Sequence, residues 1–305
     1  LRTISIGADA TPRMADLPRA SPAPQGEHAT IYFTSGSTGP PKAVLGTHVG
    51  LATLAAWFRT TFASSTTDRI SLVTDLGFVA TLRSLFGTLT SGATLCIAPD
   101  QLLPEQAIAW VTAARCTVLA TTATTVRTWL AERDPNTPRP TLRWTFFGGE
   151  PLPDTLVQAW RAVIAGSGRV ANVWGATETG GARAWYEVPD PPHPGIQPLL
   201  HPLTGTQLLI LDEGGAALRD VDQQGELAVR ARDLPVGYAN DPEATARCFV
   251  ANPFTHRHDD RIVHSGDRAI RRADGLIEIL GRADDQVSLG GLRIDSGEVA
   301  GVLRA

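Results

Sequence analysis

The chain has few of the residues that mark disulfide scaffolds, zinc sites or nucleic-acid binding. Its 305 residues include three cysteines, Cys96, Cys116 and Cys248, and they contain no CxxC pair. We therefore expect neither a disulfide framework nor a zinc site, and this usage of cysteine is typical of a reducing, cytoplasmic compartment. Aspartate and glutamate (31) outnumber lysine and arginine (27), which gives a net charge of −4. Because there is also no basic block, we expect no nucleic-acid partner.

Long apolar runs are also missing. No stretch approaches the roughly 20 apolar residues needed to cross a bilayer. The N-terminus shows no basic head followed by an apolar segment, so we expect no signal peptide and no membrane partner. The first residue is leucine, which suggests a piece of a longer chain. What is present is an ordinary globular composition, 43% hydrophobic and 19% charged, long enough for about two domains.

Short apolar runs alternate with helix-like patterns over residues 29–185, after an exposed lead-in at residues 1–28 that is rich in proline and polar residues. The β-type runs lie at 29–33, 70–74, 94–97, 116–120, 142–147 and 169–174, and the helical patterns at 47–62, 79–89, 104–114, 125–132 and 154–165. Strands that alternate with helices in this way are typical of a parallel sheet covered by helices. We therefore predict an α/β core of layered sheets with flanking helices.

The pattern changes at about residue 186, where a proline-rich stretch begins. Short alternating runs follow at 206–212, 225–230, 261–264, 269–271 and 276–280. Turns rich in glycine and aspartate separate them, which predicts a β-rich, barrel-like lobe over residues 186–281. We interpret residues 282–305 as a hinge and the start of a truncated C-terminal subdomain.

The segment TSGSTGPPK at residues 34–42 follows a predicted strand and ends in Lys42. Glycines allow close approach of the backbone, hydroxyl and free N–H groups can surround phosphate oxygens, and the lysine supplies positive charge. A polar surface turn is the structural alternative. The segment is not a Walker A loop, and no GxGxxG follows a strand. It predicts a phosphate loop whose lining residues are Thr34, Ser35, Gly36, Ser37, Thr38 and Gly39.

Further motifs follow in order along the chain. They are FGGEPL at 147–152, NVWGATE at 172–178, GEL at 225–227, GY at 237–238, DPEAT at 241–245, SGD at 265–267 and GRADDQV at 281–287. Together with YFTSGSTGPPKAV at 32–44, this series resembles the adenylate-forming superfamily, which includes acyl-CoA ligases, luciferases and the adenylation domains of nonribosomal peptide synthetases. The Arg-x-Asp-x-Gln-Val form at 282–287 is typical of synthetase adenylation domains, so we favour that branch over an acyl-CoA ligase.

The resemblance implies a reaction in which ATP activates a carboxylic acid as an acyl-adenylate. The acyl group would then pass to the phosphopantetheine thiol of a peptidyl carrier protein, with neighbouring synthetase domains as further partners. Lys42, Thr177 and Glu178 are the catalytic residues that it implies. The loop at 34–42 would hold the β- and γ-phosphates, Thr177 would contact the α-phosphate or the substrate carboxylate, and Glu178 would bind Mg²⁺. A surface or capping role is the alternative for Glu178.

The resemblance also implies a site for the nucleoside. Gly148 and Gly149 would allow the backbone to approach the base, and Trp174 would stack on adenine. Asp267 would accept hydrogen bonds from the ribose hydroxyls, and Arg282 would donate to the same sugar. The structural alternatives are a core position for Trp174 and a turn position for Asp267.

The acyl pocket implied by the resemblance consists of Phe78, Val79, Ala80, Arg83, Ala120, Phe146, Val173, Gly181 and Ala182. Amino-acid-activating domains usually carry an aspartate where this chain has Val79, and that carboxylate pairs with the substrate ammonium. A buried ammonium without its counter-charge is costly, so we expect an acid without an α-amino group. An α-keto or α-hydroxy acid is the first choice and an aryl or fatty acid the second. Asp75, through a slipped register, would restore an amino-acid substrate, and Arg83 either binds a polar substrate end or faces solvent.

The last residues depart from the family pattern. Asp284 is expected at the hinge, with a solvated ion pair as its alternative. Ser288 and Gly290 stand where the family has lysine and arginine, and the chain stops at Ala305, before the catalytic lysine of the C-terminal subdomain. This chain alone is therefore expected to lack full activity. An acyl-CoA ligase and a degenerate, non-catalytic nucleotide-binding module are the alternative interpretations.

Overall fold

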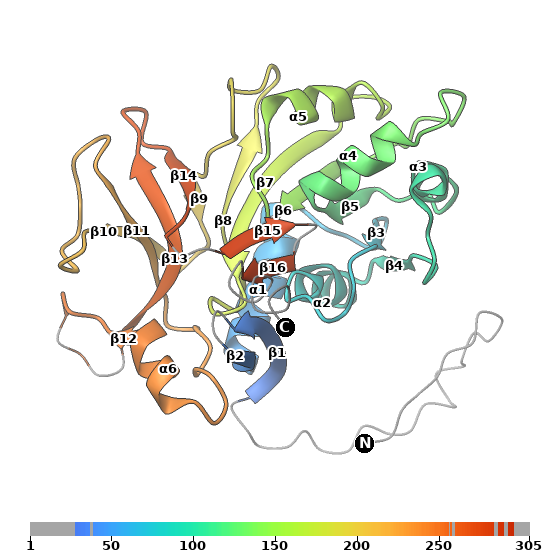
Figure 1. The fold of residues 1–305 in the computed structure, drawn as a ribbon. Coiled ribbons are helices and arrows are strands. Elements are labelled where there is room, and N and C mark those ends of the chain that lie inside the picture. The colour runs from blue at the N-terminus through green and yellow to red at the C-terminus, as the bar shows by residue number, and fades with distance from the viewer. Residues whose placement is uncertain are drawn as a thin grey trace, which may run out of the picture.

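The computed structural model describes residues 28–36, 39–255, 257, 260–283, 286–289 and 292–295. Two sheets lie side by side in it, and helices pack around the larger one (Figure 1). This mixture of layered sheets and flanking helices confirms the predicted α/β class. None of the helices in the described ranges combines the length and the apolar character that a bilayer span requires.

The larger sheet has seven strands in the order β4, β3, β5, β6, β7, β8 and β9. Their bounds are β3 (Arg69–Leu72), β4 (Thr94–Ile97), β5 (Val118–Thr121), β6 (Trp144–Gly148), β7 (Arg169–Ala176), β8 (Gly181–Val188) and β9 (His201–Pro202). Strands β4 to β7 are parallel, as the alternation with helices predicts. Strands β8 and β9 run antiparallel, so the sheet continues past residue 186.

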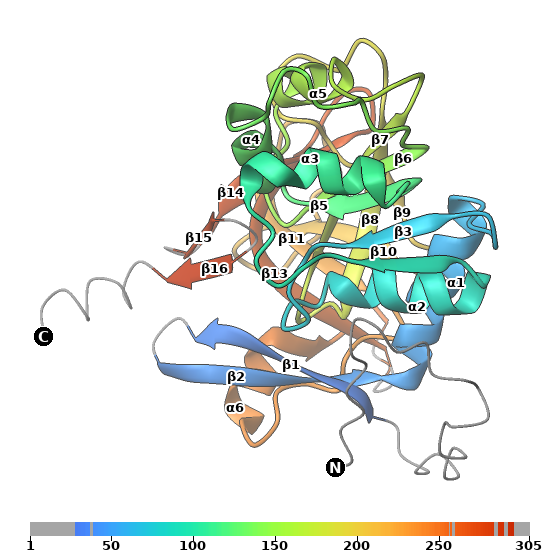
Figure 2. The ribbon, with the colours of Figure 1, turned by 90° about the vertical axis from the view of Figure 1, so that its right-hand side faces the viewer.

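Helices cover both faces of this sheet (Figure 2). One face packs against α1 (His48–Thr61) and α2 (Thr81–Ser91), and the other against α3 (Pro104–Ala113), α4 (Ala123–Ala131) and α5 (Asp154–Arg161). Successive strand side chains point to opposite faces. Phe146 of β6 therefore belongs to the apolar cluster under α1 and α2, and Phe147 to the cluster under α3, α4 and α5.

Local signals set the ends of the helices that border the site. Helix α1 follows β2 without a loop, and the Thr47 hydroxyl caps it by accepting from the Gly50 amide at 3.0 Å. Helix α2 ends at Gly92, whose φ of 69° is the left-handed conformation that glycine adopts without strain.

The smaller sheet is antiparallel and has the order β10, β11, β13 and β12, with β14 also paired to β13. Its elements are β10 (Gln207–Leu211), β11 (Gln224–Arg230), α6 (Pro242–Cys248), β12 (Phe249–Ala251), β13 (Arg261–Arg271) and β14 (Ile277–Arg282). The two runs predicted at 261–264 and 269–271 are one strand. It carries irregularities in its pairing, and Gly266 at φ 73° lies between the predicted runs.

Two hairpins complete the described chain. One pairs β1 (His28–Gly36) with β2 (Gly39–Thr47), and the other pairs β15 (Gln286–Leu289) with β16 (Leu292–Asp295). The first corrects the sequence analysis, because most of the predicted phosphate loop forms the ends of two paired strands. Pro41 is accommodated in β2 because a two-stranded ribbon has open edges, where a missing N–H group is tolerated.

Candidate functional site

The β1–β2 hairpin carries Lys42, which lies opposite Thr34 in the register of the two strands. Thr34 is buried and Lys42 is half-buried. The structure describes the backbone, but not the side-chain surroundings, of three further predicted loop residues, Ser35, Gly36 and Gly39. Two others lie outside the described residues, Ser37 and Thr38.

Tyr238 connects this hairpin to the turn that follows β7. The Lys42 ammonium lies 5.4 Å from the centroid of the Tyr238 ring, and the Tyr238 hydroxyl donates to Glu178 Oε1 at 3.1 Å. The Leu45 amide donates to the carbonyl of Gly237 at 2.9 Å, which fixes Tyr238 against β2. Burial, and next the neighbouring Glu178 carboxylate, raise the pKa of Tyr238, so its hydroxyl stays protonated and remains a donor.

Glu178 lies in the turn between β7 and β8 and is only 8% exposed. The turn is closed by Thr179, whose hydroxyl accepts from the Ala176 amide at 2.9 Å, and by the Gly180 amide, which donates to the Thr177 carbonyl at 3.0 Å. These bonds hold Thr177 and Glu178 at the end of β7. The alternative of a solvent-exposed Glu178 is therefore wrong.

Trp174, Asp267 and Arg282 form a second group, between the two sheets. The Trp174 indole Nε1 donates to Asp267 Oδ2 at 2.8 Å, and Arg282 Nη1 donates to Asp267 Oδ1 at 3.1 Å and to the Ser265 carbonyl at 2.6 Å. Arg282 lies so near Gly266 that a Cβ there would be 3.0 Å from its guanidinium carbon. Three of the five predicted nucleoside residues are thus joined through Asp267, and Trp174 also packs against the apolar clusters of the smaller sheet.

Glu226, which the sequence motif alone does not mark as a site residue, holds the strand next to Asp267. One carboxylate oxygen accepts from the Gly266 amide at 2.9 Å, and the other lies 2.8 Å from His264 Nδ1. The hydrogen bond to Glu226 raises the pKa of His264. Burial favours a higher pKa for Glu226, but the bonds from His264 and Gly266 outweigh it and the pKa is lowered. The pair fixes the bend of β13 next to Asp267.

Gly148 is the last residue of β6, beside β7, and Gly149 follows it. A Cβ at Gly148 would lie 3.0 Å from the Val173 carbonyl oxygen, and Gly149 has a φ of 79°, so both positions favour glycine. The two strands are parallel, so these glycines lie at the same sheet edge as Thr177. Ligands commonly bind at this edge in α/β folds.

Most residues of the predicted acyl pocket gather on the α1–α2 face of the sheet. Five belong to one apolar cluster or pack against it, Val79, Ala120, Phe146, Val173 and Ala182. Gly181 lies beside Val79, whose Cγ2 would be 3.8 Å from a Cβ at that glycine. Phe78 is half-buried in the turn before α2, and Ala80, the residue preceding α2, is exposed. Asp75 is exposed too, and its carboxylate accepts from the Gly77 amide at 2.6 Å.

Arg83 is a buried residue of this face and not a surface residue. It is 5% exposed, and its guanidinium carbon lies 5.4 Å from the centroid of the Phe146 ring. The alternative of a solvent-facing Arg83 is therefore wrong. Burial lowers the pKa of Arg83 to about 10.

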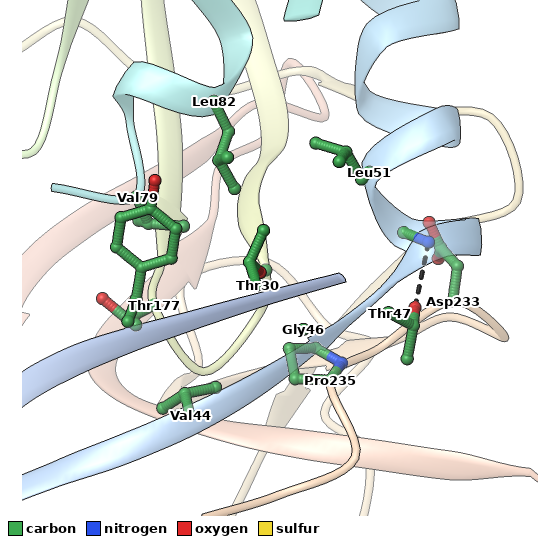
Figure 3. A pocket seen from close by; sticks show the side chains of 13 residues that line it. Thr30, Val44, Gly46, Thr47, Leu51, Val79, Leu82, Thr177, Asp233 and Pro235 are labelled. Atoms are coloured by element: carbon green, nitrogen blue, oxygen red, sulfur yellow. Dashed lines mark hydrogen bonds between the residues drawn. The ribbon is translucent and has the colours of Figure 1, made fainter. Parts of the chain in front are cut away.

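A cavity opens between the β1–β2 hairpin, α1 and the start of α2 (Figure 3). Val79, Thr177 and Gly180 contribute to its lining. Asp233 lies on the opposite side of the cavity, next to Thr47. The cavity therefore joins the predicted catalytic turn to the predicted acyl wall.

A buried ion pair that sequence reasoning missed stands beside this cavity. Arg183 Nη1 lies 2.7 Å from Asp233 Oδ1, and Arg183 Nε donates to the Thr179 carbonyl at 2.6 Å. The pair ties β8 to the turn that holds Glu178. No sequence signal indicates it, because its partners lie 50 residues apart.

Asp284, the predicted hinge residue, lies outside the described residues.

In the part of the chain that is described, no three His, Cys, Asp or Glu side chains form a group that could hold a metal ion. A cation at Glu178 would thus need oxygen ligands from elsewhere, and the phosphates of a nucleotide are of that kind.

The chain matches a known protein family and several individual relatives. The family described as AMP-binding enzyme matches residues 4–239. Tyrocidine synthase 1 of Brevibacillus parabrevis is 32% identical over 281 residues, which cover 91% of this chain and 25% of that protein. The dimodular nonribosomal peptide synthase of Bacillus subtilis is 34% identical over 280 residues, which cover 90% of this chain and 11% of that protein. The chain thus spans a quarter or less of these relatives.

Two solved structures of adenylation domains resemble the fold of this chain. The Vibrio cholerae adenylation domain AlmE, crystallised with glycyl-adenosine-5′-phosphate, superposes with a TM-score of 0.80 at 27% identity, covering 92% of this chain and 53% of that one. NpsA-ThdA, an artificially fused adenylation–PCP di-domain from Klebsiella oxytoca, gives a TM-score of 0.77 at 25% identity, covering 91% and 55%. The chain spans about half of each of these proteins.

Proposed function

The chain belongs to the AMP-binding enzyme family, as an adenylation domain of the nonribosomal peptide synthetase kind, and from this we propose what it activates and how. It binds ATP and a carboxylic acid and forms an acyl-adenylate and pyrophosphate. The acyl group is then loaded onto the phosphopantetheine thiol of a carrier protein. The acid has no α-amino group.

One observation carries the proposal of adenylation: Tyr238 brings Lys42 and Glu178 into one site. Its ring lies 5.4 Å from the Lys42 ammonium and its hydroxyl donates to Glu178. A cation and a carboxylate that are far apart in sequence therefore face a common point, next to Thr177. This pairing suits a phosphate chain, because Lys42 would contact the phosphates directly and Glu178 would hold the metal ion that accompanies them.

The first half-reaction needs neutralised phosphates and an aligned nucleophile. Lys42 and the hairpin tip hold the β- and γ-phosphates, and Thr177 binds the α-phosphate or the acid's carboxylate. Glu178 would hold Mg²⁺, because a carboxylate is the kind of oxygen ligand that this ion takes from proteins. The magnesium ion would supply charge neutralisation on the phosphates.

The nucleoside binds at the junction of the two sheets. Asp267 accepts from the ribose hydroxyls while Trp174 and Arg282 hold its carboxylate in place. Arg282 would donate to the same sugar, for which the five N–H groups of a guanidinium are suited. Adenine lies between Trp174 and the flat backbone of Gly148 and Gly149.

The substrate assignment rests on Val79 and on the position of Asp75. Val79 lines the cavity with Thr177, where the bound acid would lie, and it offers no counter-charge to an ammonium group. Asp75 is exposed and occupied with the Gly77 amide, which opposes a register that brings it into the pocket. We therefore favour an α-keto or α-hydroxy acid.

The partners proposed are those of a synthetase assembly in the cytoplasm. NpsA-ThdA joins an adenylation domain to PCP, which supports a carrier protein as the acceptor here. Transfer to the carrier and contacts with neighbouring synthetase domains involve parts beyond the described residues.

The test is ATP–pyrophosphate exchange by the full-length protein, across matched keto, hydroxy, amino and aryl acids. We expect exchange with a keto or hydroxy acid, and its loss in Lys42→Ala. Exchange driven best by an α-amino acid would contradict the Val79 argument and leave adenylation intact. Thioester formation on free CoA without a carrier would instead assign an acyl-CoA ligase, and no exchange with any acid would indicate a degenerate module.

A further inference from the structure

The guanidinium of Arg83 is a buried cation without an anionic partner among the described residues. The side chain is 5% exposed, its Nε atom is buried and makes no hydrogen bond, and no carboxylate of the described chain pairs with it. The guanidinium carbon lies 5.4 Å from the centroid of the Phe146 ring, which is an aromatic contact and not an ion pair. The molecule as described thus leaves this charge uncompensated.

Such a position is unfavourable unless something neutralises it. Arginine does not lose its proton in proteins, and even the lowered pKa of about 10 keeps Arg83 charged at neutral pH. The attraction of a ring face is weaker than the desolvation that a buried ion must overcome. Arg183, which is equally buried, is paired with Asp233 at 2.7 Å. This fold therefore does supply a carboxylate to a buried arginine elsewhere.

The position of Arg83 relates it to the acyl pocket. It lies in the first turn of α2, four residues after Val79, which belongs to the turn directly before that helix. Phe146, over which the guanidinium lies, pairs in register with Ala120 and belongs to the same apolar cluster. The cation is thus set into a wall that is otherwise apolar.

We propose that Arg83 binds a carboxylate at the far end of the activated acid, so that the substrate is a dicarboxylic acid without an α-amino group. This rests on the proposed function and narrows its substrate class. A planar guanidinium binds a carboxylate through two parallel hydrogen bonds. One arginine balances one carboxylate, and the apolar wall around it accommodates the methylene chain between the two acid groups.

The test compares acids of equal length in ATP–pyrophosphate exchange with the full-length protein. The probes are 2-oxoglutarate and 2-oxopentanoate, with 2-hydroxyglutarate and 2-hydroxypentanoate as the second pair. We expect kcat/KM for the diacid to exceed that of its monoacid by about 30-fold or more, since pairing a buried charge is worth at least about 2 kcal/mol and 1.4 kcal/mol corresponds to a factor of ten. In Arg83→Met the diacid loses this advantage through KM, and Arg83→Lys restores part of it.

Arg169→Met is the matched control. Arg169 also lies over a ring of the same cluster, 4.1 Å from the centroid of Trp144, but it is half-exposed and paired with Glu187. We expect Arg169→Met to prefer the diacid over the monoacid by the same factor as the wild type. Thermal unfolding supplies the second measurement: the diacid raises the melting temperature of the wild type and not of Arg83→Met, and ligand-free Arg83→Met is at least as stable as the wild type.

The outcomes separate the two proposals. Exchange that prefers the monoacids, or a diacid preference unchanged in Arg83→Met, overturns the role of Arg83 and leaves adenylation standing. Ligand-free Arg83→Met that fails to fold assigns Arg83 a packing role and also overturns it. Absence of exchange with every acid refutes adenylation itself.

Discussion

Replacing Tyr238 by phenylalanine tests the contact on which the proposed phosphate site depends. The substitution removes the hydroxyl that donates to Glu178 at 3.1 Å and keeps the ring that lies 5.4 Å from the Lys42 ammonium. The backbone is unaffected, because the Tyr238 amide donates to the Thr245 hydroxyl at 2.9 Å in both forms. The variant therefore removes the hydroxyl's contacts with Glu178 and Cys248 and leaves the ring in place.

The magnitude follows from the burial of Glu178, which is 8% exposed. A hydrogen bond to a charged group contributes about 1.5–3 kcal/mol, and little water reaches Glu178 to replace the lost donor. We expect a loss of unfolding free energy in that range. Because Glu178 is no longer held toward Lys42, kcat/KM for ATP should fall by about 10-fold to 100-fold, since 1.4 kcal/mol corresponds to a factor of ten.

The assay is ATP–pyrophosphate exchange at varied ATP, combined with denaturant unfolding. Tyr186→Phe is the control, since Tyr186 is buried in the other apolar cluster, on the far face of the large sheet. Tyr186→Phe should leave the ATP dependence of exchange unchanged. If Tyr238→Phe behaves in the same way, the bond to Glu178 does not organise the site and our reasoning about it is wrong.

Three further predictions concern the carboxylates of the site. Glu178→Gln keeps the acceptor for Tyr238 and removes the charge, so exchange should fall by about 100-fold with little change in unfolding free energy; equal exchange would show that the charge is not needed. Asp267→Asn weakens the ribose acceptor and the ion pair with Arg282, so the KM for ATP should rise by about 10-fold, as an ATP titration would show. The Glu226–His264 pair should stabilise the fold most between about pH 4.5 and 6.5. The raised pKa of His264 stabilises the fold fully below pH 6.5, the ordinary pKa of histidine, and this stabilisation is lost as the pH rises through the raised pKa. The lowered pKa of Glu226 stabilises the fold fully above pH 4.5, the ordinary pKa of glutamate, and this stabilisation is lost as the pH falls through the lowered pKa. Unfolding measured across this range in the wild type and in Glu226→Gln should differ most inside that window, and parallel curves would contradict the prediction.

Local patterns were sufficient for the parallel core of the fold and insufficient at its edges. The runs that alternate with helices gave the strands from β4 to β7 and the helices around them. Strand β8 was missed, although GARAWYEV alternates in burial, because the proline-rich stretch after it suggested a loop. The hairpin at residue 36 was missed because proline and glycine predict a turn, while pairing with β1 is a contact that a local pattern does not contain.

The same distinction applies to the site. Motif order predicts site roles for Lys42 and Glu178, and position relative to the motifs predicts pocket roles for Val79 and Arg83. It did not identify Tyr238 as the residue that joins the first two, because that bond spans 60 residues. Nor could it decide whether Arg83 is buried, since this depends on how α2 lies on the sheet.

The direct passage of β2 into α1 at Thr47 has a mechanical consequence. Lys42 near one end of this continuous backbone would face the phosphates, and Trp57 and Phe58 near the other pack into the wall where the acid would lie. With no loop between the hairpin and the helix to absorb movement, a tilt of the hairpin on nucleotide binding would also tilt the helix. We therefore expect the affinities for ATP and for the acid to depend on each other, and by the same factor in both directions.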